Sequence, residues 1–191
     1  AAPADRGVLG HRRLSIMDPQ GGRQPILGTA DDRALVANGE IYNFRRLNDQ
    51  LTRRDALRTR SDSETILRLF EEQEQAAVEQ LDGMFAFVIA DGEHVFAARD
   101  PIGIKPLYIG RSDDSWCFAS EQKALVGFAD EVEEFPPGSF FHSARGWTRY
   151  YDVPEQDWRE PTSGPDEAAR EIRTTLEAAI GKRLMSDVPL G

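Results

Sequence analysis

Runs of apolar residues and period-two alternation fill the middle of the chain, and they predict an α+β protein with layered sheets. An Asp-Gly pair at residues 91–92 predicts a tight hairpin between two of the strands. The strands are expected at residues 8–16, 34–38, 84–90, 94–98, 107–110, 116–119, 139–142 and 148–151.

Apolar residues at helical spacing mark the expected helices. Ser61 and Glu64 have the spacing of a capping box directly before a periodic apolar run, so a helix is expected to begin there. Two shorter helices are expected at residues 44–51 and 122–126.

The pattern divides the chain into three parts. Residues 1–153 carry the strand-rich pattern, and residues 154–166 are rich in Pro, Ser, Gly and acidic side chains, which predicts a linker. Residues 167–191 contain an amphipathic helix over 167–183. One such helix cannot bury its apolar face alone. We therefore expect this last part to be the truncated start of a second domain.

Composition narrows the classes of function. The chain has 23 Lys and Arg against 33 Asp and Glu, and its formal net charge of -10 repels polyanions, so nucleic acid is not an expected partner. No apolar run approaches the roughly 20 residues that cross a bilayer, so no membrane contact is expected. The single cysteine, Cys117, cannot form an internal disulfide, which suits a reducing cytoplasm. Because it lies in an apolar run, Cys117 is expected to be a buried, inert thiol.

Several familiar chemistries have no support in the residues. The three histidines are far apart and lack Cys, Asp or Glu at metal-ligand spacing, so no metal site is expected. The chain contains no G-x-G-x-x-G sequence, no phosphate-binding P-loop and no G-x-S-x-G elbow.

The most informative stretch runs an apolar strand into Asn38, Gly39 and Glu40. These residues can grip an amide and an ammonium group, although Asn-Gly after a strand is also an ordinary start of a hairpin turn. Arg13 lies beside an apolar run and can offer its guanidinium to a carboxylate, or it can be an exposed strand arginine. Asp62 can cap the helix that begins there or pair with a ligand ammonium. If these groups converge, they define an amino-acid site.

Ordered motifs over nearly the whole chain resemble the glutaminase half of bacterial, glutamine-hydrolysing asparagine synthetases. The matching stretches are Arg13-Leu14-Ser15-Ile16-Met17-Asp18, Gly22-Arg23-Gln24-Pro25, Asn38-Gly39-Glu40-Ile41-Tyr42-Asn43, Ser61-Asp62-Ser63-Glu64, Gly83-Met84-Phe85-Ala86-Phe87, Arg99-Asp100, Gly103-Ile104-Lys105-Pro106-Leu107-Tyr108, Ala119-Ser120-Glu121 and Lys123-Ala124-Leu125. Two further stretches, at residues 134–138 and 184–189, are typical of the synthetase branch rather than of more distant class II amidotransferases.

The resemblance implies a four-layer αββα N-terminal-nucleophile (Ntn) hydrolase sandwich, the class II glutamine amidotransferase fold, followed by the first helix of a synthetase domain. It also implies a glutamine site. In that site Asn38 and Gly39 form the oxyanion hole, through a side-chain amide and a backbone N–H, and Glu40 and Asp62 hold the ammonium group. The rest of the implied site is the run Arg13, Leu14, Ser15, Ile16 and Met17, with Arg13 on the α-carboxylate.

The resemblance further implies that the nucleophile is a cysteine at the mature N-terminus, with its own α-amine as the base. This chain begins with four other residues, Ala1-Ala2-Pro3-Ala4, and Cys117 cannot replace that cysteine because it is internal. An omitted start, an isolated fragment and a natural loss of glutaminase activity are the three explanations. The presence of the pocket residues favours the first, which predicts Met-Cys-Gly some tens of residues before Ala1. A hydrolytically inactive scaffold, as in β-lactam synthetases, is the alternative.

The resemblance assigns the remaining chemistry to the synthetase domain. There, Mg-ATP would activate aspartate as an adenylate, which ammonia reaches through an internal tunnel, so no cofactor is expected on the residues of this chain. The expected partners are glutamine and the C-terminal synthetase domain of the same chain. A homodimer and a carboxylate acceptor other than aspartate both stay open, and the expected location is the cytoplasm.

Overall fold

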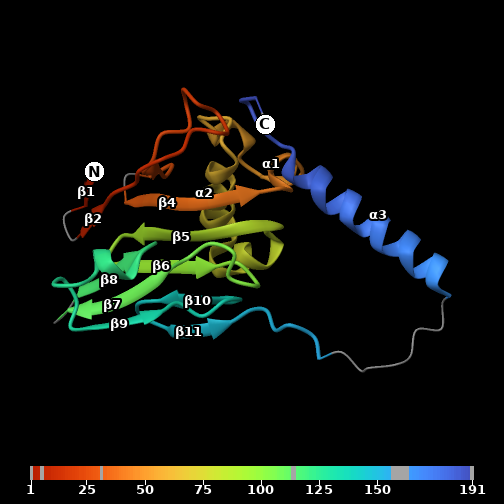
Figure 1. Cartoon of the computed structure of the whole chain (residues 1–191). Coiled ribbons are helices and arrows are strands. Elements are labelled where there is room, and N and C mark those ends of the chain that lie inside the picture. The colour runs from red at the N-terminus through yellow and green to blue at the C-terminus, as the bar shows by residue number, and fades with distance from the viewer. Residues whose placement is uncertain (1, 5–6, 31, 113–114, 156–163, 190–191) are drawn as a thin grey trace.

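Two antiparallel sheets packed face to face form the centre of the protein (Figure 1). The computed structural model describes residues 2–4, 7–30, 32–112, 115–155 and 164–189. The larger sheet has the order β11-β10-β6-β5-β4-β3, and the smaller has the order β8-β7-β9. A separate pair, β1 and β2, forms an antiparallel ribbon.

The strands have the following bounds: β1 Ala2–Ala4, β2 Gly7–Leu9, β3 Ile26–Leu27, β4 Arg33–Ile41, β5 Gly83–Asp91, β6 His94–Arg99, β7 Tyr108–Ser112, β8 Ser115–Ala119, β9 Glu131–Glu134, β10 Ser139–His142 and β11 Gly146–Arg149. The α-helices are α1 Phe44–Gln50, α2 Asp62–Gln73 and α3 Pro165–Arg183, and the 3₁₀ helices are η1 Arg54–Ala56, η2 Glu74–Gln80 and η3 Gln122–Ala124.

Side-chain alternation along β5 explains why the two sheets and the helices form separate packed layers. Phe85, Phe87 and Ile89 join the apolar cluster that α1, α2 and η2 share with the six-stranded sheet. Ala86 and Val88 point to the other face and join the cluster between the two sheets. A strand buried on both faces reads as a continuous apolar run, as it does here.

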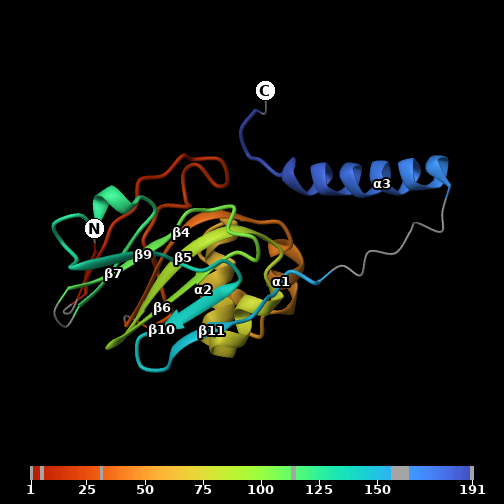
Figure 2. The ribbon, with the colours of Figure 1, turned by 60° about the horizontal axis from the view of Figure 1, so that its bottom comes forward.

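The α+β class and the main strands of the sheets are as the sequence predicts, and the helices lie on the outer face of the larger sheet (Figure 2). Three of the four predicted layers, namely the helices, the large sheet and the small sheet, are formed by residues 7–155. The predicted C-terminal helix is confirmed as α3, which extends away from these layers (Figure 1). Of the predicted linker, residues 156–163 lie outside the described part of the chain.

Three local predictions were wrong. The strand expected over residues 8–16 ends at Leu9. The residues after it form neither strand nor helix, and the Ile16 carbonyl accepts from the Asp187 N–H instead of from a neighbouring strand. The helix expected over 122–126 is only the short η3. Ser61 is the N-cap of α2 but makes no side-chain cap bond, and the Glu64 carboxylate accepts from other donors, so the expected capping box does not form.

A buried carboxylate at the end of β6 shapes the loop that follows it. Asp100 is fully buried and accepts hydrogen bonds from the N–H groups of Phe85, Ile102, Ile104 and Lys105, over 3.2, 3.2, 2.9 and 3.0 Å. Such bonds to an ionised group are stronger than neutral ones. The loop therefore holds Lys105 in a fixed position near the end of β4.

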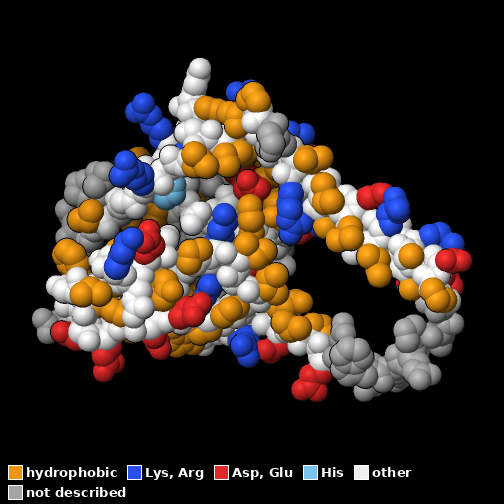
Figure 3. Space-filling model, viewed as in Figure 1, with side chains coloured by type: hydrophobic (Ala, Val, Ile, Leu, Met, Phe, Trp, Pro, Cys, Tyr) orange, Lys and Arg blue, Asp and Glu red, His pale blue; other side chains and the backbone are white. Residues whose placement is uncertain are grey.

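Apolar side chains remain uncovered along α3. Ile172, Leu176 and Ile180 are each more than half exposed, and orange side chains follow this helix in the space-filling view (Figure 3). Even so, no helix in the described residues is both long enough and apolar enough to cross a membrane.

Candidate functional site

The edge of β4 that faces away from β5 carries the first part of the candidate site. β3 pairs only with the beginning of β4, and side chains bind the edge beyond it. The Gln24 side chain donates to the Ala37 carbonyl over 2.9 Å and accepts from the Ala37 N–H over 2.6 Å. Further along, the Ile41 N–H donates to Asp62 Oδ2 over 2.8 Å. Because alternate residues of an antiparallel strand direct their N–H groups to one edge, the Gly39 N–H points between these two occupied positions.

The side chains of Asn38 and Glu40 share one face of β4. Leu35, Ala37 and Ile41 point the other way, into the core beneath the helices. Asn38 lines a cavity of about 100 Å³ between the two sheets, and His11, Val88, Leu107, Phe118 and Ser120 are among the other residues around it. An amide side chain and a backbone N–H donor therefore lie next to each other at one point of β4.

Charged side chains meet where β4 ends and α2 begins. Asp62 is only 3% exposed, and this burial raises the pKa of its carboxyl, although the Arg13 guanidinium acts in the opposite direction. Burial also raises the pKa of Glu40, and the Asp62 carboxylate adds to that rise. Lys105 and Arg183 lower the pKa of Glu40. The charges that the sequence analysis singled out thus act on one another in the folded protein.

Residues 10–22 form the loop that carries Arg13. Arg13 Nη2 donates to the carbonyl of Met17 and, over 3.0 Å, to that of the next residue. Met17 is buried in the core, Ile16 is half-buried, and Leu14 and Ser15 are exposed. The loop therefore presents its backbone and the Arg13 side chain to the site, whereas the Leu14 and Ser15 side chains face solvent.

Asp18 joins this loop to the start of α2, and the sequence analysis did not select it. Its Oδ1 accepts from the Gly21 N–H and its Oδ2 from the Arg60 N–H, both over 2.9 Å. The bond from Arg60 lowers the pKa of Asp18, so the carboxylate is ionised at neutral pH. Because Arg60 lies two residues before Asp62, Asp18 fixes where the loop lies relative to Asp62. The available signal was Asp18-Pro-Gln-Gly-Gly, a turn sequence in which an aspartate binds a later N–H group.

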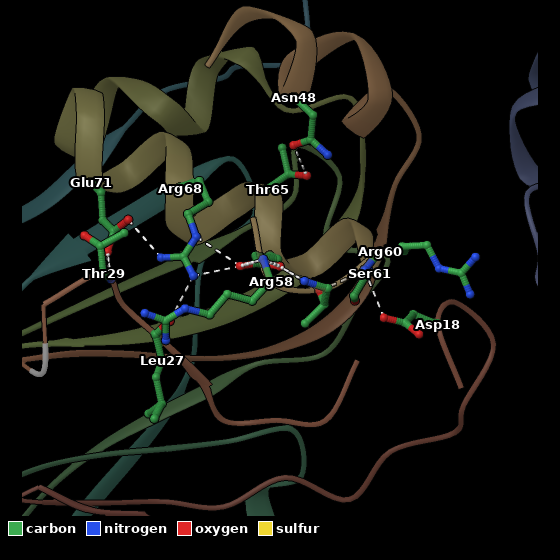
Figure 4. Close-up of polar contacts among 12 residues, drawn as sticks. Asp18, Leu27, Thr29, Asn48, Arg58, Arg60, Ser61, Thr65, Arg68 and Glu71 are labelled. Atoms are coloured by element: carbon green, nitrogen blue, oxygen red, sulfur yellow. Dashed lines mark hydrogen bonds and ion pairs between the residues drawn. The ribbon is translucent and has the colours of Figure 1, made fainter. Parts of the chain in front are cut away.

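An ionic network is buried under the first turns of α2, the helix that begins at Asp62 (Figure 4). Glu64 is fully buried and accepts from the N–H groups of residues 58–59, with distances of 2.7 to 3.1 Å. Arg68 is 2% exposed, and its guanidinium lies 2.7 Å from Glu64 Oε1 and 2.9 Å from Glu71 Oε2. The network connects α2 to the segment before it, which leads through the N-cap Ser61 to Asp62.

Two buried side-chain atoms of the described residues have no hydrogen-bond partner, and both border the site: His11 Nδ1 and the Tyr42 hydroxyl. His11 lines the same cavity as Asn38. Burial raises the pKa of Tyr42, and the Glu40 charge contributes to the rise. An unpaired buried polar group costs about 1–3 kcal/mol and is rare. Two polar atoms beside the site thus have no partner among the described residues, and neither of these two residues was predicted to belong to the site.

Cys117 lies apart from these groups. It is in β8, where it pairs with Gly110, and it does not line the cavity beside Asn38. The prediction of a buried thiol was too strong, because Cys117 is half-buried.

Comparison with known proteins decides the family. Residues 3–146 match the profile of the glutamine amidotransferase domain. The chain belongs to this family.

Its fold is that of the class II, Ntn-hydrolase amidotransferases, as two solved structures show. The glutamine phosphoribosylpyrophosphate amidotransferase from B. subtilis, complexed with ADP and GMP, has a TM-score of 0.56 and 28% identity, covering 66% of this chain and 31% of that one. The allosteric regulatory enzyme of purine biosynthesis has a TM-score of 0.57 and 29% identity over the same shares.

The amidotransferase domain is also similar in sequence to asparagine synthetases. Asparagine synthetase [glutamine-hydrolyzing] 2 of Arabidopsis thaliana is 43% identical over 187 residues, covering 96% of this chain and 32% of the relative. Asparagine synthetase B [glutamine-hydrolyzing] of Escherichia coli K12 is 38% identical over 193 residues, covering 98% of this chain and 34% of the relative. The chain spans about a third of the length of these relatives.

Proposed function

We propose that the amidotransferase domain binds glutamine at the end of β4 and hydrolyses it to glutamate and ammonia, as the glutaminase part of an asparagine synthetase. The observation that carries this proposal is the edge of β4, where the Gly39 N–H lies between positions taken by Gln24 and Asp62, beside the Asn38 amide. One edge thus offers donors for a carboxamide oxygen next to carboxylates for an ammonium group.

The charges match the two ends of an amino acid. Arg13 uses Nη2 to bind its own loop, and its remaining N–H groups suit the α-carboxylate of glutamine. Glu40 and Asp62 suit the α-ammonium group, and binding of this cation offsets the cost of ionising one buried and one half-buried carboxyl. The backbone of Leu14, Ser15, Ile16 and Met17 completes the binding loop in this proposal.

The chemistry requires stabilisation of an oxyanion. A thiolate attacks the amide carbon of glutamine, and the negative charge that forms on the oxygen is held by the Asn38 amide and the Gly39 N–H. The carbon–nitrogen bond then breaks, ammonia leaves with the proton taken from the thiol, and water hydrolyses the thioester to glutamate. The thiol in this proposal is that of an N-terminal cysteine, since Cys117 lies apart from the site.

The proposed fate of the ammonia is amidation of aspartate in a synthetase domain that uses Mg-ATP. The described residues contain no group of three His, Cys, Asp or Glu side chains that could hold a metal ion. In this proposal Mg-ATP is bound by the synthetase domain, as the resemblance to asparagine synthetases implies, and no residue of this chain has a role in binding it.

The test is glutamate release from glutamine by the protein expressed from its complete open reading frame. Replacement of Asn38 by alanine is expected to lower kcat about 100-fold with little change in KM, because it removes a donor that acts mainly on the oxyanion. Gln50→Ala, which removes an exposed amide on α1, is the control and should leave kcat unchanged. A wild-type protein that releases no glutamate would contradict the proposal and favour an inactive scaffold.

The affinity for glutamine is expected to fall as the pH is lowered. The fall should occur at a higher pH than it would if the carboxyl groups of the site had ordinary pKa values. Burial raises the pKa of both Asp62 and Glu40, and a protonated carboxyl cannot pair with ammonium, so the affinity is full above the raised pKa values and is lost below them. Calorimetric titration of this chain with L-glutamine across the acidic range measures the effect. Asp62→Asn should weaken binding and flatten the pH profile, whereas Asp49→Asn, at an exposed residue of α1, should change neither.

A further inference from the structure

The end of α3 and the residues after it lie against the amidotransferase domain, although the rest of α3 does not (Figure 1). We call residues 182–187 the docking segment. Lys182 Nζ lies 2.6 Å from Asp82 Oδ2, and the Arg183 guanidinium lies 5.1 Å from the centre of the Tyr42 ring. Both contacts are made just beyond the end of β4, next to Glu40. The docking segment therefore borders the proposed glutamine site.

Asp187 connects the docking segment to the loop that carries Arg13. Its Oδ2 accepts from the Asp18 N–H over 2.8 Å, and its own N–H donates to the Ile16 carbonyl over 3.1 Å. The two bonds hold the backbone on either side of Met17. Met185, two residues earlier, packs against the core, which keeps the docking segment in place.

The backbone held by Asp187 is the same backbone that fixes Arg13. Arg13 Nη2 donates to the carbonyls of Met17 and Asp18, and these residues lie within or beside the stretch that Asp187 clamps. The loop over residues 10–22 forms neither strand nor helix, so its conformation depends on such side-chain bonds. A continuous path of hydrogen bonds thus runs from Asp187 through the loop to the Arg13 guanidinium.

We propose that Asp187 is a positioning residue for glutamine, which holds the 13–18 loop so that Arg13 meets the α-carboxylate. This inference rests on the proposed function and adds a residue from beyond α3 to the glutamine site. It follows that glutamine affinity depends on whether the docking segment is in place. A displacement of α3 that pulls Asp187 from the loop would weaken glutamine binding without any change at Asn38 or Gly39.

Kinetics of glutamate release by the protein from its complete open reading frame test this role. Asp187→Ala is expected to raise KM for glutamine about three- to tenfold, as for loss of one charge-assisted bond at an exposed position, with kcat unchanged. Asp187→Asn keeps an oxygen that can accept from Asp18 and should restore most of the affinity. Arg149→Met is the control: it removes an exposed ion pair with Asp152, 2.9 Å long, on the strand at the far edge of the large sheet, touches neither the loop nor the docking segment, and should leave KM unchanged.

The outcomes separate this inference from the proposed function. If the wild-type protein releases no glutamate, the proposed function fails and the inference with it. If the wild-type protein is active and Asp187→Ala has an unaltered KM, only the inference is overturned. Equal losses of kcat and thermal stability in Asp187→Ala and Asp187→Asn would also overturn it, because they would indicate a general structural role. Slower amide exchange of Asp18 in the wild type than in Asp187→Ala would support it.

Discussion

Replacement of Gly39 by alanine is expected to destabilise the amidotransferase domain by about 4 kcal/mol, because two separate costs add. A Cβ atom at this position would lie 2.0 Å from the Met84 carbonyl oxygen and 2.7 Å from Phe85 Cα, and both are backbone atoms of the neighbouring strand. The residue also has a φ of +149°, which residues other than glycine rarely adopt. Strain and overpacking cost about 1–3 kcal/mol each.

Urea denaturation of this chain measures the loss for Gly39→Ala. Gly92→Ala is the matched control, since Gly92 also has a positive φ, +58°, but a Cβ there meets nothing within 4 Å. The control should lose only about 1–2 kcal/mol. If both variants lose the same free energy of unfolding, the close approach of β5 to Gly39 is not what makes glycine necessary at this position. The glycine is therefore required by the fold, in addition to any role of its N–H group in catalysis.

The strands around Gly39 could be predicted from the sequence because their burial leaves a local pattern. The alternation of Phe85 and Phe87 with Ala86 and Val88 is visible in the sequence, and it corresponds to the two packed layers. The end of β4 was predicted less well, because the strand was expected only over residues 34–38, with a hairpin turn at Asn38-Gly39 as the alternative. The strand instead continues to Ile41, and this continuation places Asn38 and Glu40 on one face.

The loop that carries Arg13 could not be predicted in this way. Its apolar residues resemble a strand, but its backbone is bound by Asp18 and by Asp187, which lies 169 residues further along the chain. A local pattern contains no information about so distant a partner. The same holds for His11 and Tyr42, whose significance lies in unpaired atoms that only the packed structure reveals.

The capping box shows how tertiary contacts override a local signal. Ser61 and Glu64 have the right spacing, and α2 does begin after Ser61. Glu64, however, lies against Arg68, four residues later on the same helix, and the segment before the helix folds back to donate to it. The helix start was therefore predicted correctly for a reason that proved wrong. What the sequence signal missed is a buried charge network.

Replacement of Arg68 by methionine is expected to destabilise the domain by about 3–5 kcal/mol, since it breaks that network from its centre. Arg68 is the cation between Glu64 and Glu71, and its Nη2 also donates to the Leu27 carbonyl over 3.1 Å. Because methionine fills much of the same volume, the loss of stability comes mainly from buried carboxylates left without a cation and less from an empty space. The free energy of unfolding from urea titration measures it.

Two variants decide whether buried charge is the cause. Arg54→Met removes an ion pair of similar length, 2.8 Å to Asp49, but both of its side chains are more than 60% exposed, so the cost should stay below about 1 kcal/mol. Adding Glu64→Gln to Arg68→Met should recover part of the loss, because the neutral amide needs no cation in the buried site. If the two residues act independently, the losses of Arg68→Met and Glu64→Gln simply add in the double variant. That result would mean that Arg68 stabilises α2 by packing. If part of the loss is recovered, the buried ion pair between Arg68 and Glu64 stabilises the start of α2, where Asp62 lies.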